Sequence, residues 1–404
     1  MRDQQLDLAG PLQRSLFADL QPQPADALLS LIKLFESDGR PGKIDLGVGV
    51  YRDAAGATTV FKAVKAAEAI LQQTQPTKAY IGPEGDLAFI DHIETLAFGR
   101  GSPRPLVGAQ TPGGTGALRL AADLLHTARP GARVWLGTPT WPNHAPIFAQ
   151  AGLSLSTYRH VDPRTGELCF DEMIDTLRGA EAGDVVLLHG CCHNPTGADP
   201  TVEQWRTLAD LISDRGLIPL VDQAYQGLGQ GLEADAAGLR CVVDASDTAL
   251  ITYSCDKNFG LYRDRVGALL IKAPGQAEAV RSTMLMLARS LWSMPPDHGA
   301  AVVRVILDSP DLTTLWREEL DGMCARLRSV RTALASACPE LHRLEVQNGL
   351  FAQLALPGPA IERLRRDHAV YMAGSGRINL AGLNPHNIPV FAAALEGCRE
   401  GAPA

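Results

Sequence analysis

The chain has 404 residues, 46% of them hydrophobic, which provides enough apolar side chains for a large core and too many for a disordered chain. Because this length exceeds the size at which a single core usually stops growing, we expect two lobes. A net charge of −8 at pH 7 without a basic run argues against nucleic acid or an anionic membrane as a partner.

The N-terminal residues predict neither secretion nor insertion into a membrane. Residues 1–17 lack the long apolar stretch of a secretory signal, and the sequence has no apolar run of about 18 residues. We therefore expect a cytoplasmic protein whose eight cysteines are reduced thiols. Residues 20–26 are rich in proline and suit an extended arm that leads into the first helix.

A glycine-rich turn at residues 111–125 (TPGGTGALRLAADLL) runs into a helical pattern. Gly113 and Gly114 let backbone N–H groups approach an anion closely, Thr115 adds a hydroxyl, and the helix N-terminus adds a positive dipole. An ordinary tight turn has the same composition, so this segment alone leaves both interpretations open.

Short apolar runs in the middle of the chain predict buried strands, because they lack the alternation of a half-exposed strand. They are residues 132–139, 184–190, 216–222, 249–254 and 266–272. Residues 201–216 predict a helix between two of these strands, with Thr201 and Gln204 as a capping box and Gly216 at the end. Its buried stripe is Trp205, Leu208, Ala209 and Ile212. Strand, helix and strand at this spacing predict a mostly parallel sheet covered on both faces.

Ligands of such sheets bind beyond the carboxyl ends of the strands. Several polar or aromatic residues follow directly after the apolar runs and are expected at that edge. They are the glycine turn, Trp141, Asn194, Asp222, Tyr225 and residues 254–260 (SCDKNFG). This convergence favours an enzyme.

Cys191 and Cys192 are adjacent and lie between His189 and His193. The pattern allows a metal site, but neighbouring cysteines rarely aim at one ion and no second ligand pair supports it. Buried thiols in a strand-to-loop turn are the favoured interpretation.

Two charged residues at strand ends are candidates for chemistry. Asp222 is either part of a surface loop or a buried carboxylate that needs a cationic partner such as a pyridinium. Lys257 follows a strand in a short polar turn, where desolvation would supply the neutral amine that attacks a carbonyl. Arg265, eight residues on, can bind a dianion as a fork. Solvated surface charges are the alternative for both cations.

Helical patterns dominate after about residue 310. Residues 312–337 and 360–369 predict helices, and residues 351–356 and 376–382 predict strands that flank the second of them. This region is typical of a second α/β lobe, joined by the N-terminal segment.

Taken together, these segments resemble the aspartate and aromatic-amino-acid aminotransferase family, a branch of the fold-type I enzymes that use pyridoxal 5'-phosphate (PLP). The resemblance runs from LGVGVYRD (46–53) through TPGGTGALR, TWPNH, HGCCHNPTGADP, DQAYQG and KNFGLYRDRVG to SGRINLAG (375–382). It implies an α/β fold with a large domain at 59–310, whose mostly parallel seven-stranded sheet is covered by helices. It also implies a smaller α/β domain built from 1–58, with an N-terminal arm, and 311–404.

The resemblance implies roles for individual residues around the cofactor. Lys257 would form the Schiff base with PLP and then move the substrate's proton, and Asp222 would pair with the pyridinium nitrogen. Tyr225 and Asn194 would hydrogen-bond the phenolic oxygen of the ring, and Trp141 would stack on it. The phosphate would be held by Gly113, Gly114, Thr115, Ser254, Arg265 and Tyr80 of the partner subunit.

Substrate binding is implied in the same way. Arg377 would hold the α-carboxylate as a bidentate clamp, with Gly49, Trp141 and Asn194 nearby. Arg289 would reach across a homodimer with shared active sites and bind a side-chain carboxylate.

Two departures from the family pattern are visible. Asp256 stands where relatives usually carry a serine that bonds the phosphate, so a like-charge contact is expected unless the carboxylate turns away or pairs. Met294 stands where members that prefer acidic substrates commonly carry a polar residue. With Trp292, it favours the aromatic-amino-acid branch.

The resemblance therefore implies a PLP-dependent aminotransferase that moves an amino group by a ping-pong mechanism. The amino acid is aromatic, such as tyrosine or phenylalanine, or aspartate, and 2-oxoglutarate is the acceptor. The alternatives are an aspartate-preferring aminotransferase and a PLP-dependent lyase or decarboxylase. A PLP-binding regulator is disfavoured because the residues before Leu46 show no basic helix pair. A nicotinamide enzyme is disfavoured because the order of strand, turn, helix and strand-end acid is missing.

Overall fold

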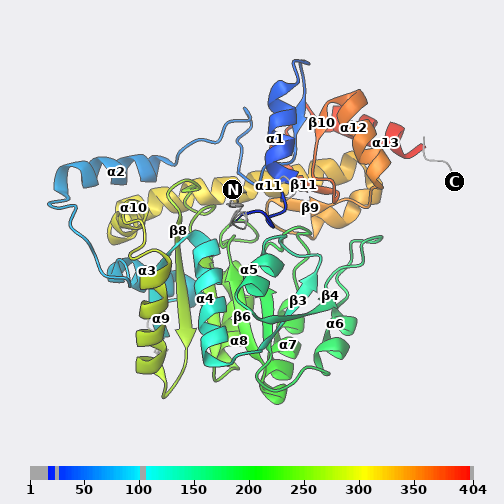
Figure 1. Ribbon diagram of the computed structural model, residues 1–404. Coiled ribbons are helices and arrows are strands. Elements are labelled where there is room, and N and C mark those ends of the chain that lie inside the picture. Colours follow the sequence, from blue (N-terminus) through cyan, green and yellow to red (C-terminus); the bar gives the residue numbers. More distant parts are fainter. Residues whose placement is uncertain (1–16, 23–26, 101–105, 401–404) are drawn as a thin grey trace, which may run out of the picture.

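The computed structural model describes residues 17–22, 27–100 and 106–400 of the protein. Residues 23–26 of the extended arm expected at residues 20–26 lie outside the described residues, as do residues 1–16. Figure 1 shows a larger lower part with a central sheet and a smaller upper part in which the N-terminal helix α1 lies close to the C-terminal helices.

A seven-stranded sheet forms the centre of the larger part. The order in space is β2 (Leu106–Pro112), β8 (Val266–Lys272), β7 (Ala249–Ser254), β6 (Ile218–Gln223), β5 (Val185–His189), β3 (Arg133–Thr138) and β4 (Ser154–Arg159). Neighbouring strands are parallel except where β8 pairs with β2 and β7. The expected mostly parallel sheet is thereby confirmed. The five strands predicted in the middle of the chain are β3, β5, β6, β7 and β8.

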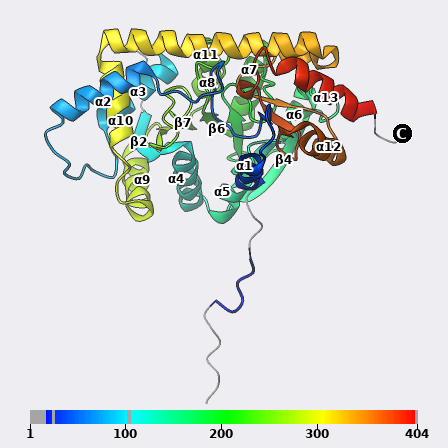
Figure 2. The ribbon, with the colours of Figure 1, turned by 90° about the horizontal axis from the view of Figure 1, so that it is seen from above.

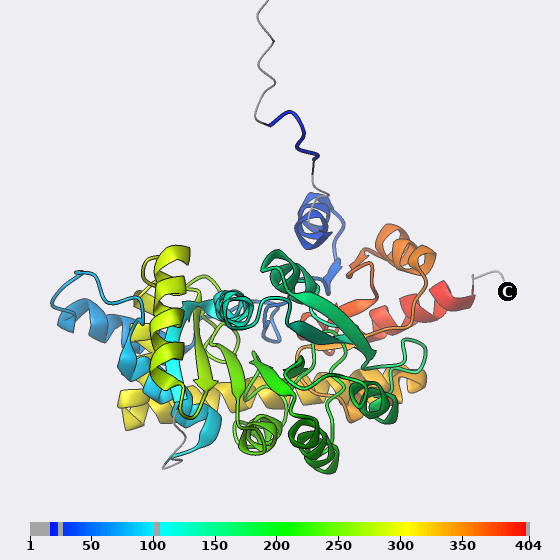
Figure 3. The ribbon, with the colours of Figure 1, turned by 60° about the horizontal axis from the view of Figure 1, so that its bottom comes forward.

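Helices cover both faces of this sheet, as the two layers in Figure 3 show. The apolar cluster on one face includes side chains of α4 (Gly113–Ala128), α5 (His144–Gln150) and α9 (Ala277–Leu291). The cluster on the other face draws on the helices α2 (Lys62–Thr74), α3 (Leu87–Phe98), α6 (Phe170–Leu177), α7 (Val202–Arg215), α8 (Ala237–Asp244) and α10 (His298–Asp308). Every residue of β5 and β7 is buried, and most of them are apolar, as expected for strands that are covered on both faces.

Helix α7 forms as the sequence predicts. Thr201 and Gln204 make a reciprocal capping box, and Gly216 ends the helix in the left-handed conformation at φ 62°, which costs little without a Cβ. The predicted stripe of Trp205, Leu208, Ala209 and Ile212 is buried. The helix therefore packs on the sheet through one face, and this packing fixes the loops at both of its ends.

The long helix α11 (Pro310–Ala337) runs along the whole molecule in Figure 2. Trp316 and Leu320 in its first half belong to the large core, whereas Val330 and Leu334 belong to a separate apolar cluster in the smaller part. This second cluster also contains Ile44 and Leu46, so the N-terminal segment does join the C-terminal region.

The remaining elements build the smaller part. They are the helices α1 (Ala27–Ser37), α12 (Gly358–His368) and α13 (Ile388–Glu400), the parallel strands β1 (Ile44–Asp45) and β10 (Val370–Tyr371), and the antiparallel strands β9 (Phe351–Gln353) and β11 (Arg377–Asn379). Short 3-10 helices lie at Ala234–Ala236, Pro339–Glu345 and Leu380–Gly382. We infer from the separate core that this part is a second domain, and the bounds 59–310 and 1–58 plus 311–404 stay a prediction. Among the described helices, none has an apolar stretch that could cross a membrane.

Candidate active site

One edge of the sheet collects most of the predicted site residues. The carboxyl ends of the parallel strands meet there, and so does the first residue of β8, because β8 runs antiparallel to β7. Trp141 follows β3, Asn194 follows β5, Tyr225 follows β6, Lys257 follows β7, and Arg265 precedes β8. The topology thus brings together side chains that are far apart in the sequence.

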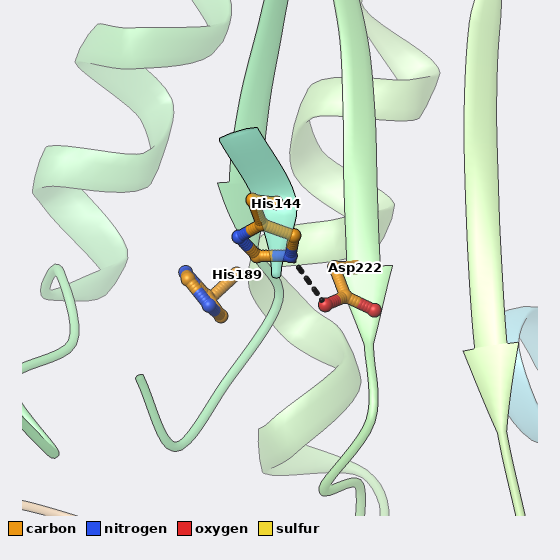
Figure 4. A group of neighbouring side chains, drawn as sticks. All are labelled: His144, His189 and Asp222. Atoms are coloured by element: carbon orange, nitrogen blue, oxygen red, sulfur yellow. Dashed lines mark hydrogen bonds and ion pairs between the residues drawn. The ribbon is translucent and has the colours of Figure 1, made fainter. Parts of the chain in front are cut away.

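Asp222, on β6, is buried and hydrogen-bonded on both carboxylate oxygens. Its Oδ2 lies 3.1 Å from Nε2 of His144, and its Oδ1 accepts from the hydroxyl of Thr252 at 3.1 Å. Figure 4 shows the imidazole of His144 pointing at the carboxylate. Burial by itself raises the pKa of Asp222, but the hydrogen bonds from His144 and Thr252 and the nearby imidazoles of His144 and His189 together outweigh it, with His144 contributing most, and the net pKa lies below its usual value. Asp222 is therefore kept as an anion that can hold a cationic partner.

Lys257 lies among groups of mixed charge. Its Nζ lies 5.3 Å from the centre of the Tyr225 ring and 3.8 Å from Oδ2 of Asp256. Burial lowers the pKa of Lys257, against the opposing effect of the carboxylates of Asp256 and Asp222. The environment therefore increases the fraction of neutral amine, which is the nucleophilic form.

Tyr225 and Asn194 lie next to each other at this edge. Nδ2 of Asn194 donates to the hydroxyl of Tyr225 at 3.5 Å, the long end of a hydrogen bond. Burial raises the pKa of Tyr225, so the phenol stays protonated and remains a donor. Oδ1 of Asn194 is buried and has no hydrogen-bond partner among the described residues.

The glycine turn forms a cradle at the start of α4. A Cβ added to Gly113, whose φ is +71°, would come within 2.6 Å of Nη2 of Arg265, and one added to Gly114 would come within 3.1 Å of Cβ of Ser254. Larger residues would fill this space, and α4 begins here, so its first-turn N–H groups, including that of Thr115, have no partner within the helix. The cradle has the donors and the charge that a phosphate needs.

Asp256 is not turned away from this cradle. Its Oδ2 lies 2.7 Å from Nη1 of Arg265, so the carboxylate that was expected to oppose a phosphate is paired with the arginine expected to bind it.

Arg377, the predicted carboxylate clamp, lies on β11 beside aromatic surfaces. Its guanidinium carbon is 4.5 Å from the centre of the Phe351 ring, and Nη2 donates to the carbonyl of Gly47 at 3.0 Å. A Cβ on Gly49 would come within 3.0 Å of Phe351, so Gly49 lies against the same ring. Arg377 and Trp141 both line a cavity of about 1700 Å³. This volume exceeds the usual range for a small-molecule site.

Two predicted residues lie apart from this group. Tyr80 is 94% exposed, and Arg289, in the last turn of α9, is exposed with Nη1 bonded to the hydroxyl of Ser293. Within one chain, neither is placed among Lys257, Asp222 and Arg377. Trp292 and Met294 follow α9 and are half-buried.

Some contacts of the site were not predicted from the sequence. His144 is the last residue of the TWPNH motif and had no predicted role, yet it contacts Asp222 and packs edge-on against Trp141 with ring centres 5.3 Å apart. Phe351 packs edge-on against Tyr225 at 6.1 Å. Residue spacing alone did not signal either contact.

The cysteine and histidine cluster is buried. Burial raises the pKa of Cys191 to about 12 and that of Cys192 well above its usual value, which keeps both thiols protonated and disfavours metal binding. His189 faces His144, with ring centres 5.2 Å apart (Figure 4), and burial lowers its pKa to about 3. Both thiols and His189 are therefore neutral packing groups.

The groups at this edge fit PLP. Its ring nitrogen needs an anion such as Asp222, its aldehyde needs an unprotonated amine such as that of Lys257, and its phosphate needs the cradle beside Arg265. A sheet edge that carries these groups is typical of PLP-dependent enzymes. The chain belongs to the class I and II aminotransferases, because the profile of that family (Aminotransferase class I and II) matches residues 41–395.

Individual proteins that are similar to this chain are aminotransferases too. The chain is 52% identical to a tyrosine aminotransferase of Rhizobium meliloti over 91% of its own length and 96% of the relative's. It is 43% identical to an aspartate aminotransferase of Escherichia coli over 94% and 99% of the two chains. A solved aromatic-amino-acid aminotransferase of Burkholderia pseudomallei, covalently bound to pyridoxal phosphate, superimposes with a TM-score of 0.92 at 36% identity over 95% and 99%. The protein is thus a PLP-dependent aminotransferase of fold type I.

Proposed function

We propose that the protein transfers the amino group of an aromatic amino acid, such as tyrosine or phenylalanine, or of aspartate to 2-oxoglutarate. The observation that carries this proposal is the position of Arg377. Its cation lies against the ring of Phe351 and lines the same cavity as Trp141. A carboxylate clamp beside one aromatic ring, in a cavity lined by another, suits an amino acid whose side chain is apolar and flat.

The residues of the chain divide the work of the reaction. PLP, when bound, supplies the electron sink for cleavage of the bond to the α-proton. Arg377 holds the α-carboxylate in a fixed orientation, and the amine of Lys257 takes up the proton from the α-carbon and returns it. Asp222, kept anionic by His144, holds the protonated ring nitrogen. Tyr225 and Asn194 hold the phenolic oxygen.

Arg289 is proposed as the group that admits acidic substrates, acting on the site of the partner subunit. Two facts support this role: Arg289 is exposed on its own chain, and Tyr80, the other residue expected from the partner, is 94% exposed. Side chains of this kind are available to a neighbouring copy. We therefore propose a homodimer with shared active sites, located in the cytoplasm, without nucleic acid or membrane partners.

A substrate panel tests the proposal. Tyrosine, phenylalanine, aspartate and leucine are each supplied with 2-oxoglutarate, and formation of glutamate is measured. We expect high kcat/KM for the aromatic pair, activity with aspartate and little with leucine. A profile in which aspartate alone reacts would favour the aspartate-preferring alternative. Release of ammonia or carbon dioxide without glutamate would favour a lyase or decarboxylase.

A further inference from the structure

Asp256 places a negative charge inside the proposed phosphate cradle. Its side chain is buried, and Oδ2 lies 2.7 Å from Nη1 of Arg265 and 3.8 Å from Nζ of Lys257. The backbone N–H of Asp256 donates to the hydroxyl of Ser254 at 3.3 Å. The residue thus contacts three groups that were expected to serve the cofactor.

Asp256 occupies one arm of the Arg265 fork. Both hydrogen bonds that Arg265 makes to described residues use Nη1, one to Asp256 and one to the carbonyl of Tyr262 at 3.1 Å. Nη2 points toward the glycine turn, since a Cβ on Gly113 would lie 2.6 Å from it. An incoming phosphate therefore meets a guanidinium whose charge is already partly neutralised.

We propose that Asp256 is an internal counter-ion of Arg265 that competes with the phosphate of PLP and so weakens binding of the phosphate end of the cofactor. This inference rests on the proposed phosphate site. A dianion and a carboxylate that share one arginine repel each other, and burial prevents water and salt from screening that repulsion fully. In the cofactor-free protein, the carboxylate of Asp256 neutralises part of the charge of Arg265 in the cradle.

Asp256 also helps to orient Arg265, an effect of the opposite sign. If orientation dominated, removing the carboxylate would weaken phosphate binding. Nη1 of Arg265 also donates to the carbonyl of Tyr262, a bond that replacing Asp256 does not remove, whereas the repulsion disappears with the charge. The charge effect is therefore expected to dominate.

The test compares PLP with pyridoxal, which lacks the phosphate. Dissociation constants are measured by fluorescence titration of cofactor-free wild type, Asp256→Ser and Asp256→Asn in phosphate-free buffer. We expect both variants to bind PLP about tenfold more tightly, equivalent to about 1.4 kcal/mol, and to gain much less affinity for pyridoxal, which Asp256 can affect only through the amine of Lys257. Inorganic phosphate should raise the melting temperature of both variants more than that of wild type.

Two further variants distinguish a misplaced phosphate site from a wrong role of Asp256. Asp264→Ser removes a charge from the adjoining segment and should leave PLP affinity unchanged. Arg265→Gln should weaken PLP binding, and an unchanged affinity would show that the phosphate site itself is misplaced. If Arg265→Gln weakens binding but the Asp256 variants bind PLP equally or less tightly, the competition is wrong while the site stands. Equal gains for PLP and pyridoxal would overturn the inference too, because Asp256 would then act through Lys257.

Discussion

The buried imidazole of His144 donates a hydrogen bond from Nε2 to Oδ2 of Asp222 across 3.1 Å. A carboxylate only accepts, so the proton must reside on Nε2. Nδ1 makes the second bond of the ring, to the hydroxyl of Thr140 at 2.8 Å. The start of α5 is thereby joined to the end of β6 directly beneath the proposed cofactor site.

Replacing His144 by phenylalanine should shift the pH dependence of the reaction. Without this hydrogen bond, burial dominates and the pKa of Asp222 rises. The carboxylate is then protonated over a wider acidic range, so the acidic limb of kcat/KM should move to higher pH. His144→Gln retains a donor and should lie between the two profiles. An unchanged limb, or one moved to lower pH, would contradict the role of His144.

Removing the carboxylate of Asp222 should be more damaging. In Asp222→Ala the ring nitrogen loses its anionic partner and deprotonates, which weakens the electron sink. We expect kcat/KM to fall by at least about a hundredfold, equivalent to about 2.7 kcal/mol. Asp222→Glu, which retains the charge, should keep more activity than Asp222→Ala. A loss within about tenfold for Asp222→Ala would show that the residue does something else.

Arg289→Leu should separate acidic from aromatic substrates. Loss of a charge-assisted bidentate pair costs roughly 1.5–3 kcal/mol, so kcat/KM for aspartate should fall about tenfold to a hundredfold. Tyrosine and phenylalanine, which do not need the cation, should be nearly unaffected. Arg281→Leu, on the same helix, is the matched control and should leave both substrates unchanged. Equal losses for aspartate and tyrosine would argue against a specificity role.

Mixed dimers test whether Arg289 acts across the subunit interface. Lys257→Ala and Arg289→Leu chains should together rebuild one complete site per mixed dimer, giving up to about half the aspartate activity of wild type. Lys257 and Arg377 both adjoin the Tyr225–Phe351 pair of their own chain, so Lys257→Ala mixed with Arg377→Ala should restore nothing. After verified subunit exchange, no gain in the first mixture would place Arg289 in its own subunit's site.

Much of the fold could be predicted because burial leaves a clear pattern. β5 and β7 are buried along their whole length and are mostly apolar, and α7 carries its capping box and terminal glycine in the sequence. β4 was not among the predicted strands. It is an edge strand with the sequence SLSTYR, and five of its six residues are exposed or half-buried, so its signal is weak.

Contacts of the site were less predictable than the residues. The resemblance pointed to Asp222 and Lys257, but the bond from His144 to Asp222 depends on how α5 packs beside β6. The sequence did not decide whether Asp256 pairs with Arg265, because that contact depends on the backbone conformation of Arg265. Arg265 adopts a left-handed backbone at φ +56°, a conformation that no sequence pattern signals for an arginine.

Lys257 is proposed to carry the cofactor, and borohydride reduction followed by peptide mapping identifies the lysine that does so. The purified protein should be yellow, and reduction should fix one PLP-derived group covalently. We expect this mass on the peptide that contains Lys257, and we expect neither a labelled peptide nor transamination from Lys257→Ala. Labelling of another lysine in the wild-type protein, or transamination by Lys257→Ala at the wild-type rate, would contradict it.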